Sequence, residues 1–455
     1  MKTKTILVGN ASFDHELEKQ FWLDMELTLK RQGWAILFHT MRNKPFGEHH
    51  MILPARLKHV NGYMGRLPSL EHKHYPLWLT NEIADLIIEW EHQRWSEFGY
   101  EMLIDGGLKK LAWHVDRLFQ KVKPAICMTT NKIDHGCLLF KLAADHYGVE
   151  YRFIERSPFD SILCEKSGMF AESQLFDEIK TQTKISSPRR RTSGRAIFEH
   201  LQDNTEGFRK QRELNAIDKE LLSSASQPLI FLPFDNVLWT GWAQKGHPQG
   251  DIDYPEEFRD PEQTIQFIAD EVRKQGGTLV LKFHPSDNVF GELPSTSFPD
   301  NVIRLTGGLE EILNVVDGCI VFLSKVAFPA VCKNIPTAIV STNTASILEL
   351  GDKFRTKRQL RALIKQMCSE PGRREYSESQ LNTAYDRIGW LNDEVYISKT
   401  KIFNPSRMNV LKFADDLVCS VETSEHPYPA KLGLDEWYKI SASTKKVSLG
   451  FYDVH

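Results

Sequence analysis

The feature that most constrains the fold is a series of short, mostly apolar segments that each end at a polar or charged residue. Three of them lie in the second half: LIFLP (229–233) leads to Asp235, TLVLKF (278–283) leads to His284, and CIVFL (319–323) leads to Ser324. Short apolar segments bounded by turn residues are typical of strands buried on both faces. Helix-like segments separate them, so the pattern predicts parallel strands joined by helical crossovers.

The first half repeats this alternation. Its predicted strands are KTILVGN (4–10), WAILFHT (34–40), AICMTTN (125–131) and VEYRFIER (149–156), and its clearest helix is HGCLLFKLAADHYG (135–148). We therefore predict an α/β protein with two Rossmann-like domains facing each other across a cleft. The predicted domains are a first Rossmann-like domain at 1–210, a second at 226–378, and a C-terminal helical segment at 379–455 that packs back on the first domain.

Composition excludes several classes of protein. The 455 residues include 57 Lys and Arg against 60 Asp and Glu, a net charge of −3, so no global basic field indicates nucleic-acid binding. The seven cysteines form no CxxC pair, which favours reduced thiols over a disulfide framework or a zinc site. No apolar segment approaches the roughly 18 residues of a membrane span. We expect a soluble cytoplasmic protein, with peripheral contact to the inner face of the cytoplasmic membrane as an alternative.

One basic segment bears on that alternative. KISSPRRRTSGR (184–195) is polar and contains proline, so we expect an exposed loop. A solvated loop is the plain interpretation of its three consecutive arginines. Contact with anionic lipid headgroups is the sharper hypothesis, since each basic residue near such a surface contributes about 1 kcal/mol.

Asp235, His284 and Ser324 form the candidate site. In an open parallel sheet, ligands bind outside the carboxyl ends of the strands, where the strand order reverses. Three strands would deliver a carboxylate, an imidazole and a hydroxyl to one edge. Each residue alone has an ordinary alternative, because strand-end Asp and His residues often cap turns or lie solvated at the surface.

Further candidates flank these strands. Glu155 and Arg156 end a strand of the first half, and a surface ion pair is their alternative interpretation. Ser324 precedes the helix-like KVAFPAVCKN (325–334), and a helix N-terminus suits a phosphate, although Pro329 is awkward within it. No GxGxxG motif or Walker loop is present, so an ordinary dinucleotide or P-loop site is unsupported.

The order of these features resembles a known family. Four features, taken in their order along the chain, resemble the bacterial capsule and O-antigen Kdo (3-deoxy-manno-octulosonic acid) transferases. They are an IER segment that closes the first half (154–156), a strand ending in Asp235, a strand ending in His284-Pro285 and a strand ending in Ser324. The retaining β-Kdo transferases are the most similar subgroup. These enzymes have the glycosyltransferase-B fold and use CMP-Kdo, which implies that 1–210 is the acceptor-side domain and 226–378 the nucleotide-binding domain. The resemblance covers about residues 120–345.

The resemblance implies a role for each matched residue. Asp235 would be the nucleophile of a double displacement, and Glu155 the acid/base or acceptor-orienting group. His284, followed by Pro285, and Ser324 would contact the CMP phosphate. Lys325 stands where the family usually has a second small hydroxyl residue, and it joins this phosphate-binding set.

The rest of the site follows from the same resemblance. Arg156, Lys282 and Lys325 are the nearest cations for the carboxylate of Kdo. The segment Arg156-Ser157 stands where related capsule enzymes often have glycine. The sequence contains no acidic cluster with metal-ligand spacing, so we expect no cofactor and no obligatory metal. The implied partners are CMP-Kdo and a lipid-linked oligosaccharide acceptor.

Two alternatives stay open at this point. One is a transferase of the same fold with another CMP- or UDP-sugar donor, such as a sialyltransferase. The other is a non-catalytic nucleotide-sugar-binding protein of polysaccharide export, which the strand-end carboxylates Asp235 and Glu155 disfavour.

Overall fold

The computed structural model describes most of the chain. The described residues are 4–11, 16–40, 49–52, 74–95, 101–129, 135–156, 161–166, 170–181, 185–203, 213–235, 240, 242, 252–283, 298–305, 307–395 and 397–398. They divide into two compact units. Unit 1 holds the described residues up to Glu155 together with 164–166, and unit 2 holds the others.

Unit 1 is built on parallel strands. Its elements are β1 (Lys4–Ala11), α1 (Glu16–Arg31), β2 (Trp34–Thr40), β3 (His49–Ile52), α3 (Asn81–Trp95), α4 (Glu101–Val122), β4 (Ile126–Thr129), α5 (His135–His146) and β5 (Glu150–Arg156). The order of the whole sheet is β13-β6-β5-β4-β1-β2-β3, in which β6 (Ser161–Glu165) pairs antiparallel with β13 (Ile397–Ser398). The four predicted strands of this half are confirmed, and Gly148 follows α5 with φ +62°, as a helix-ending glycine should.

A buried histidine on β2, His39, lies beside a half-buried histidine on α4, His114. His39 is 1% exposed, and its ring centroid lies 5.8 Å from that of His114 and 4.9 Å from that of Phe140. Both nitrogens of His39 and Nε2 of His114 lack hydrogen-bond partners among the described residues. Burial lowers the pKa of His39 to about 4. Burial, followed by the charges of His39 and nearby cations, lowers the pKa of His114 to about 3.

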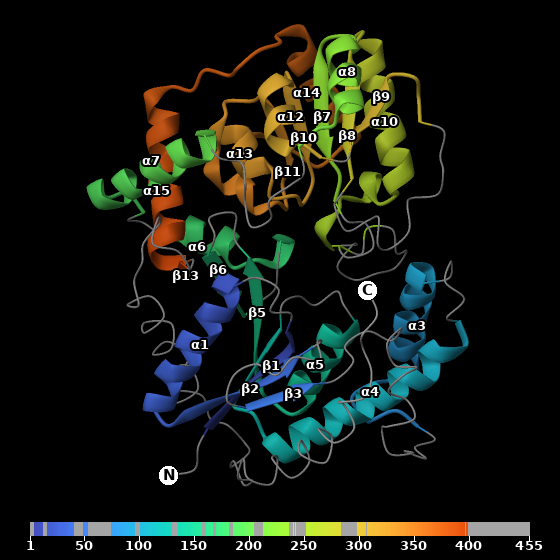
Figure 1. Cartoon of the computed structure of the whole chain (residues 1–455), viewed down its shortest axis with the longest axis vertical. Helices are drawn as coiled ribbons and strands as arrows, with labels where there is room; N and C mark the ends of the chain where they lie inside the picture. Colours follow the sequence, from blue (N-terminus) through green and yellow to red (C-terminus); the bar gives the residue numbers. More distant parts are fainter. Residues whose placement is uncertain are drawn as a thin grey trace. The chain divides into compact units, whose positions relative to one another are not determined.

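Unit 2 holds a second parallel sheet, drawn in green to orange in Figure 1. Its strands are β7 (Leu229–Pro233), β8 (Thr278–Lys282), β9 (Val302–Leu305), β10 (Gly318–Val321), β11 (Thr337–Val340) and β12 (Asp352–Phe354), in the order β12-β11-β10-β7-β8-β9. Its longer helices are α7 (Pro188–Asp203), α8 (Ala216–Ser224), α10 (Pro261–Lys274), α14 (Lys357–Ser369) and α15 (Glu378–Trp390). Shorter helical elements are η3 (Phe170–Glu172), α6 (Leu175–Thr181), η4 (Glu256–Phe258), α12 (Leu309–Val315), α13 (Ala327–Cys332), η5 (Thr344–Leu348) and η6 (Leu391–Val395).

The apolar strands of this sheet are buried on both faces because successive side chains point to opposite sides. Leu229 and Phe231 of β7 join the core cluster that also contains side chains of α7, α12 and α13. Ile230 and Leu232 join the cluster that contains side chains of α10 and α14. Helix α10 begins as predicted, with the Asp260 side chain accepting from the Gln263 N–H at 2.9 Å and proline in the first turn.

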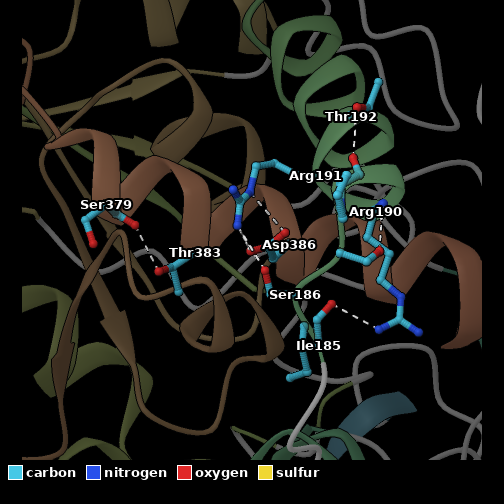
Figure 2. A network of polar contacts seen from close by, with 10 residues as sticks. Ile185, Ser186, Arg190, Arg191, Thr192, Ser379, Thr383 and Asp386 are labelled. Atoms are coloured by element: carbon cyan, nitrogen blue, oxygen red, sulfur yellow. Dashed lines mark hydrogen bonds and ion pairs between the residues drawn. The ribbon is translucent and has the colours of Figure 1, made fainter.

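The basic segment around residue 190 is a helix, so the predicted loop at 184–195 is wrong from Pro188 onward, while 185–187 lie outside any helix or strand. Helix α7 begins at Pro188, the position where a missing N–H matters least, and the arginines continue it. Figure 2 shows Arg191 directed at Asp386 of α15, with Nη2–Oδ2 at 2.7 Å, while Arg190 donates to the Ile185 carbonyl at 3.0 Å. Of the three arginines, Arg189 is exposed, and Arg190 and Arg191 are half-buried.

Helices α7 and α15 also touch through two glycines. A Cβ atom on Gly194 would lie 1.8 Å from the backbone oxygen of Tyr385, and one on Gly389 would lie 2.0 Å from that of Arg190. Both distances are far inside van der Waals contact, and the obstructing atoms belong to backbone that cannot rotate away. The crossing of these helices therefore requires glycine at both positions.

The predicted α/β class with two parallel-sheet domains is confirmed. The chain first passes from unit 1 to unit 2 between Glu155 and Arg156, and it returns to unit 1 at 164–166. Helix α7 packs against α13 and α15, and all three helices belong to unit 2. Residues 399–455 lie outside the described residues, and the predicted domain boundaries stay predictions.

Candidate functional site

The order of strands in unit 2 reverses next to β7. After β7 the chain forms β8 and β9 on one side, then crosses to the other side of β7 to form β10, β11 and β12. The carboxyl ends of β7 and β10 therefore flank a topological switch point, where open α/β sheets bind ligands. Asp235 follows β7 by two residues, and Ser324 follows β10 by three.

Hydrogen bonds bring the Asp235 carboxylate and the β10 exit together. The backbone N–H of Leu323 donates to Asp235 Oδ2 at 2.8 Å, and the phenol of Tyr254 donates to the same oxygen at 3.0 Å. The backbone N–H of Ser324 also favours the charged form of this carboxylate. Asp235 is 5% exposed, so these bonds form in a nearly dry environment.

Burial dominates the electrostatics of this carboxyl group. It raises the pKa of Asp235 from 3.8 to about 7, against the opposing effect of the donors Leu323, Tyr254 and Ser324. A carboxyl group that changes charge near neutral pH is suited to nucleophilic or proton-transfer chemistry, and such shifts are concentrated at functional sites. An ordinary turn cap at the surface would not undergo this shift, because water would solvate its charge.

The turn after β10 has a second support. The side-chain amide of Asn343, which follows β11, donates to the carbonyls of Phe322 at 2.6 Å and Ser324 at 3.1 Å. Its oxygen accepts from the Ala345 N–H at 2.8 Å. Asn343 is 2% exposed, so this turn is held from β7 on one side and from β11 on the other.

The structure brings part of the predicted site together. Lys282 is the last residue of β8, beside β7, and is 5% exposed. Ser324 and Lys325 are half-buried in the turn between β10 and α13, and α13 includes Pro329. Asp235, Lys282, Ser324 and Lys325 therefore lie at the carboxyl ends of three adjacent strands.

For the other predicted residues the structure does not describe the side chains. Glu155 and Arg156 are the last two residues of β5, and only their backbone belongs to the described part of the chain. His284 and Pro285 lie outside the described residues. Their assignments stay predictions.

Two residues at this edge were missed from the sequence. Asn343 follows the apolar strand TAIV (337–340), so the rule that found Asp235 and Ser324 would also have found it. Tyr254 lies in the polar segment DIDYPEEF (251–258), where nothing in the sequence indicates that its ring is buried. Its role depends on how that segment folds against β7.

Among the described residues, no three His, Cys, Asp or Glu side chains are arranged to share a metal ion. Within the same residues, no helix combines the length and the apolar character needed to cross a membrane.

No protein-family model matches the chain, and no curated protein matches it. Among solved structures it is similar to the KpsC β-Kdo 2,7 transferase of Thermosulfurimonas dismutans, with 12% identity, a TM-score of 0.38 and coverage of 66% of this chain and 89% of that one. For the KpsC β-Kdo 2,4 transferase of the same organism the values are 10%, 0.40, 58% and 79%. For the UDP-GlcNAc 2-epimerase of Methanocaldococcus jannaschii they are 9%, 0.34, 85% and 98%. With TM-scores this low, these likenesses carry no argument about fold or activity.

Proposed function

We propose that the chain is a nucleotide-sugar glycosyltransferase, and that it transfers Kdo from CMP-Kdo onto a bacterial surface polysaccharide. The observation that carries this proposal is the Asp235 carboxyl group. It is buried at the switch point of a parallel sheet, its pKa is raised to about 7, and its donors come from the neighbouring strand exit and from Tyr254. A carboxylate fixed by a rigid sheet edge keeps the orientation that attack on a sugar requires.

The proposed reaction is a double displacement with retention. A carboxylate oxygen of Asp235 attacks the anomeric carbon of Kdo, and the bond from that carbon to the CMP phosphate breaks, releasing CMP. The acceptor hydroxyl then attacks the same carbon, its proton passes to Glu155, and the Asp235 ester bond breaks. Atoms and charge balance without a metal or a redox cofactor.

The remaining predicted residues receive supporting roles. Ser324 and Lys325, at the β10 exit, and His284-Pro285, which follow β8, would hold the phosphate of CMP as its charge develops. Lys282 and Arg156 would neutralise the carboxylate of Kdo. The acceptor would be a lipid-linked oligosaccharide at the cytoplasmic face of the membrane.

A second candidate changes the role of Asp235. A carboxyl group with a pKa of about 7 is also suited to removing the acceptor proton as a general base, which would give single displacement with inversion. The two candidates predict opposite anomeric configurations in the product. NMR of the first product formed therefore separates them.

The test of the proposed function is a panel of donors. Purified protein is incubated with CMP-Kdo, CMP-sialic acid and UDP-sugars, and release of the nucleotide is measured with and without acceptor oligosaccharide. Of these donors, we expect only CMP-Kdo to release its nucleotide. Turnover of another donor would support a glycosyltransferase but contradict Kdo as the sugar. Binding of donors without turnover would favour a non-catalytic nucleotide-sugar-binding protein.

A further inference from the structure

We propose that Tyr254 is the positioning residue of Asp235: its phenol fixes the carboxylate and keeps it reactive near neutral pH. This inference rests on the proposed function, in which Asp235 reacts as an anion. It assigns a role to a residue from a segment without any recognisable motif.

The first support is the hydrogen bond itself. The Tyr254 phenol donates to Asp235 Oδ2 at 3.0 Å, and the Thr240 hydroxyl lies 3.0 Å from the phenol oxygen. A phenol has a single proton, so when Tyr254 donates to the carboxylate, Thr240 is the donor to Tyr254. The Leu323 N–H donates to the same Oδ2, so neither of these bonds occupies Oδ1.

The second support is the rigidity of the ring. Tyr254 is 1% exposed and stacks on Trp242 with centroids 4.3 Å apart and planes 13° apart. The Trp242 indole N–H donates to the Phe258 carbonyl at 2.6 Å. The phenol therefore cannot rotate away from Asp235 without breaking an aromatic stack in the core of unit 2.

The backbone that carries Tyr254 is held as well. The carbonyl of Asp253 accepts from the Thr342 hydroxyl at 2.7 Å, and its side chain accepts from the Ala171 N–H at 3.1 Å. Asp253 is fully buried, so both bonds are protected from water. The position of the phenol is thus fixed from the β11 exit and from η3.

The electrostatics assign the phenol a defined effect. Its hydrogen bond favours the charged form of Asp235, and so lowers a pKa that burial raises. Burial, followed by the charge of Asp235, holds the pKa of Tyr254 well above its usual value, so the phenol stays a donor throughout the range in which Asp235 titrates. Among the described residues next to these contacts, Asp253 precedes Tyr254, Lys282 ends β8, and Lys325 follows Ser324.

The experiment compares Tyr254→Phe with Tyr376→Phe. The first change keeps the aromatic ring that stacks on Trp242 and removes only the hydroxyl. Tyr376 is the matched control, because its buried hydroxyl has no partner among the described residues. Asp235 is titrated directly by carbon-13 NMR of labelled aspartate, with Asp235→Asn used to assign the signal. The pH dependence of sugar transfer is measured alongside.

We expect the titration midpoint of Asp235 to rise by about one pH unit in Tyr254→Phe and to stay unchanged in Tyr376→Phe. At pH 7 kcat should fall about fivefold, with KM for the donor nearly unchanged and with the loss disappearing above about pH 9. A structural role alone would instead lower activity equally at every pH.

An unchanged Asp235 midpoint in Tyr254→Phe would overturn the proposal. If the midpoint rises but wild type transfers no sugar, the proposed function fails while the coupling of Tyr254 to Asp235 stands. Should Tyr254→Phe not fold, Thr240→Val replaces it, since this change removes the hydroxyl that orients the phenol. We then expect a smaller rise of the midpoint, and an unchanged midpoint again overturns the proposal.

Discussion

Replacing Asp235 with Asn should stabilise unit 2 at alkaline pH, even though it removes the proposed nucleophile. Folding transfers this carboxyl group from water to a site where it is 5% exposed, which disfavours its charged form. Asn has nearly the same shape, and its side-chain oxygen can still accept from the Leu323 N–H and from the Tyr254 phenol, which share one oxygen of Asp235. The variant therefore keeps these hydrogen bonds and avoids burying a charge.

The magnitude follows from the shift of the Asp235 pKa from 3.8 to about 7. Between these values the folded protein holds a proton that the unfolded chain releases, so stability falls as pH rises through this window and is constant above it. A shift of about three pH units corresponds to a ceiling of about 4 kcal/mol. Since burying the amide has its own cost, we expect a net gain of about 2 kcal/mol above pH 8. Near pH 5, where wild-type Asp235 is protonated, the gain should be much smaller.

The assay is hydrogen exchange at increasing urea concentrations, followed on peptides from β7 and β10 so that unit 2 is measured by itself. Asp317→Asn is the matched control. Asp317 precedes β10 and accepts from the Leu229 N–H at 2.8 Å, but it is half-buried rather than enclosed. Its replacement should therefore lower stability by about 1 kcal/mol at both pH values. If Asp235→Asn instead loses stability at pH 8, the charged carboxylate stabilises the fold and the reasoning is wrong.

Three further predictions concern the rest of the chain. Alanine at Gly194 or Gly389 should lower the stability of unit 2 by at least about 2 kcal/mol in urea denaturation, because the new methyl group overlaps backbone; a neutral result would contradict the observed helix crossing. Arg189→Ser removes the one exposed arginine of the run 189–191 and so tests binding to anionic lipid; if the protein sediments with anionic vesicles as before, the lipid hypothesis is unsupported. Replacing His39 with Phe or His114 with Leu should stabilise unit 1 near pH 5 but not near pH 8. Their lowered pKa values mean that the unfolded chain binds more protons below about pH 6.5, so equal effects at both pH values would contradict this account.

The strands that end at the candidate site could be predicted because burial on both faces leaves a clear apolar signature. The segment LIFLP (229–233) is a strand in the structure, and the Asp260-Pro261 helix start is present as expected. That Asp235 and Ser324 would meet also followed, because parallel strands place their carboxyl ends along one edge.

Other features could not be predicted, because they depend on tertiary packing. The segment 184–195 looks like a loop by composition, yet Arg191 is paired with Asp386 about two hundred residues away and continues a helix. The environment of Asp235 depends on Tyr254, whose segment has no apolar periodicity. Local pattern indicates where a carboxylate emerges from a strand, whereas its degree of burial depends on contacts distant in the sequence.

The most direct test of the central claim is mass spectrometry of the protein after exposure to CMP-Kdo without acceptor. The account predicts a mass increase of one Kdo residue that maps to the peptide containing PFDNVLW (233–239), with Asp235→Asn free of the adduct and nearly inactive. An adduct on Glu155, or full activity in Asp235→Asn, would contradict the account.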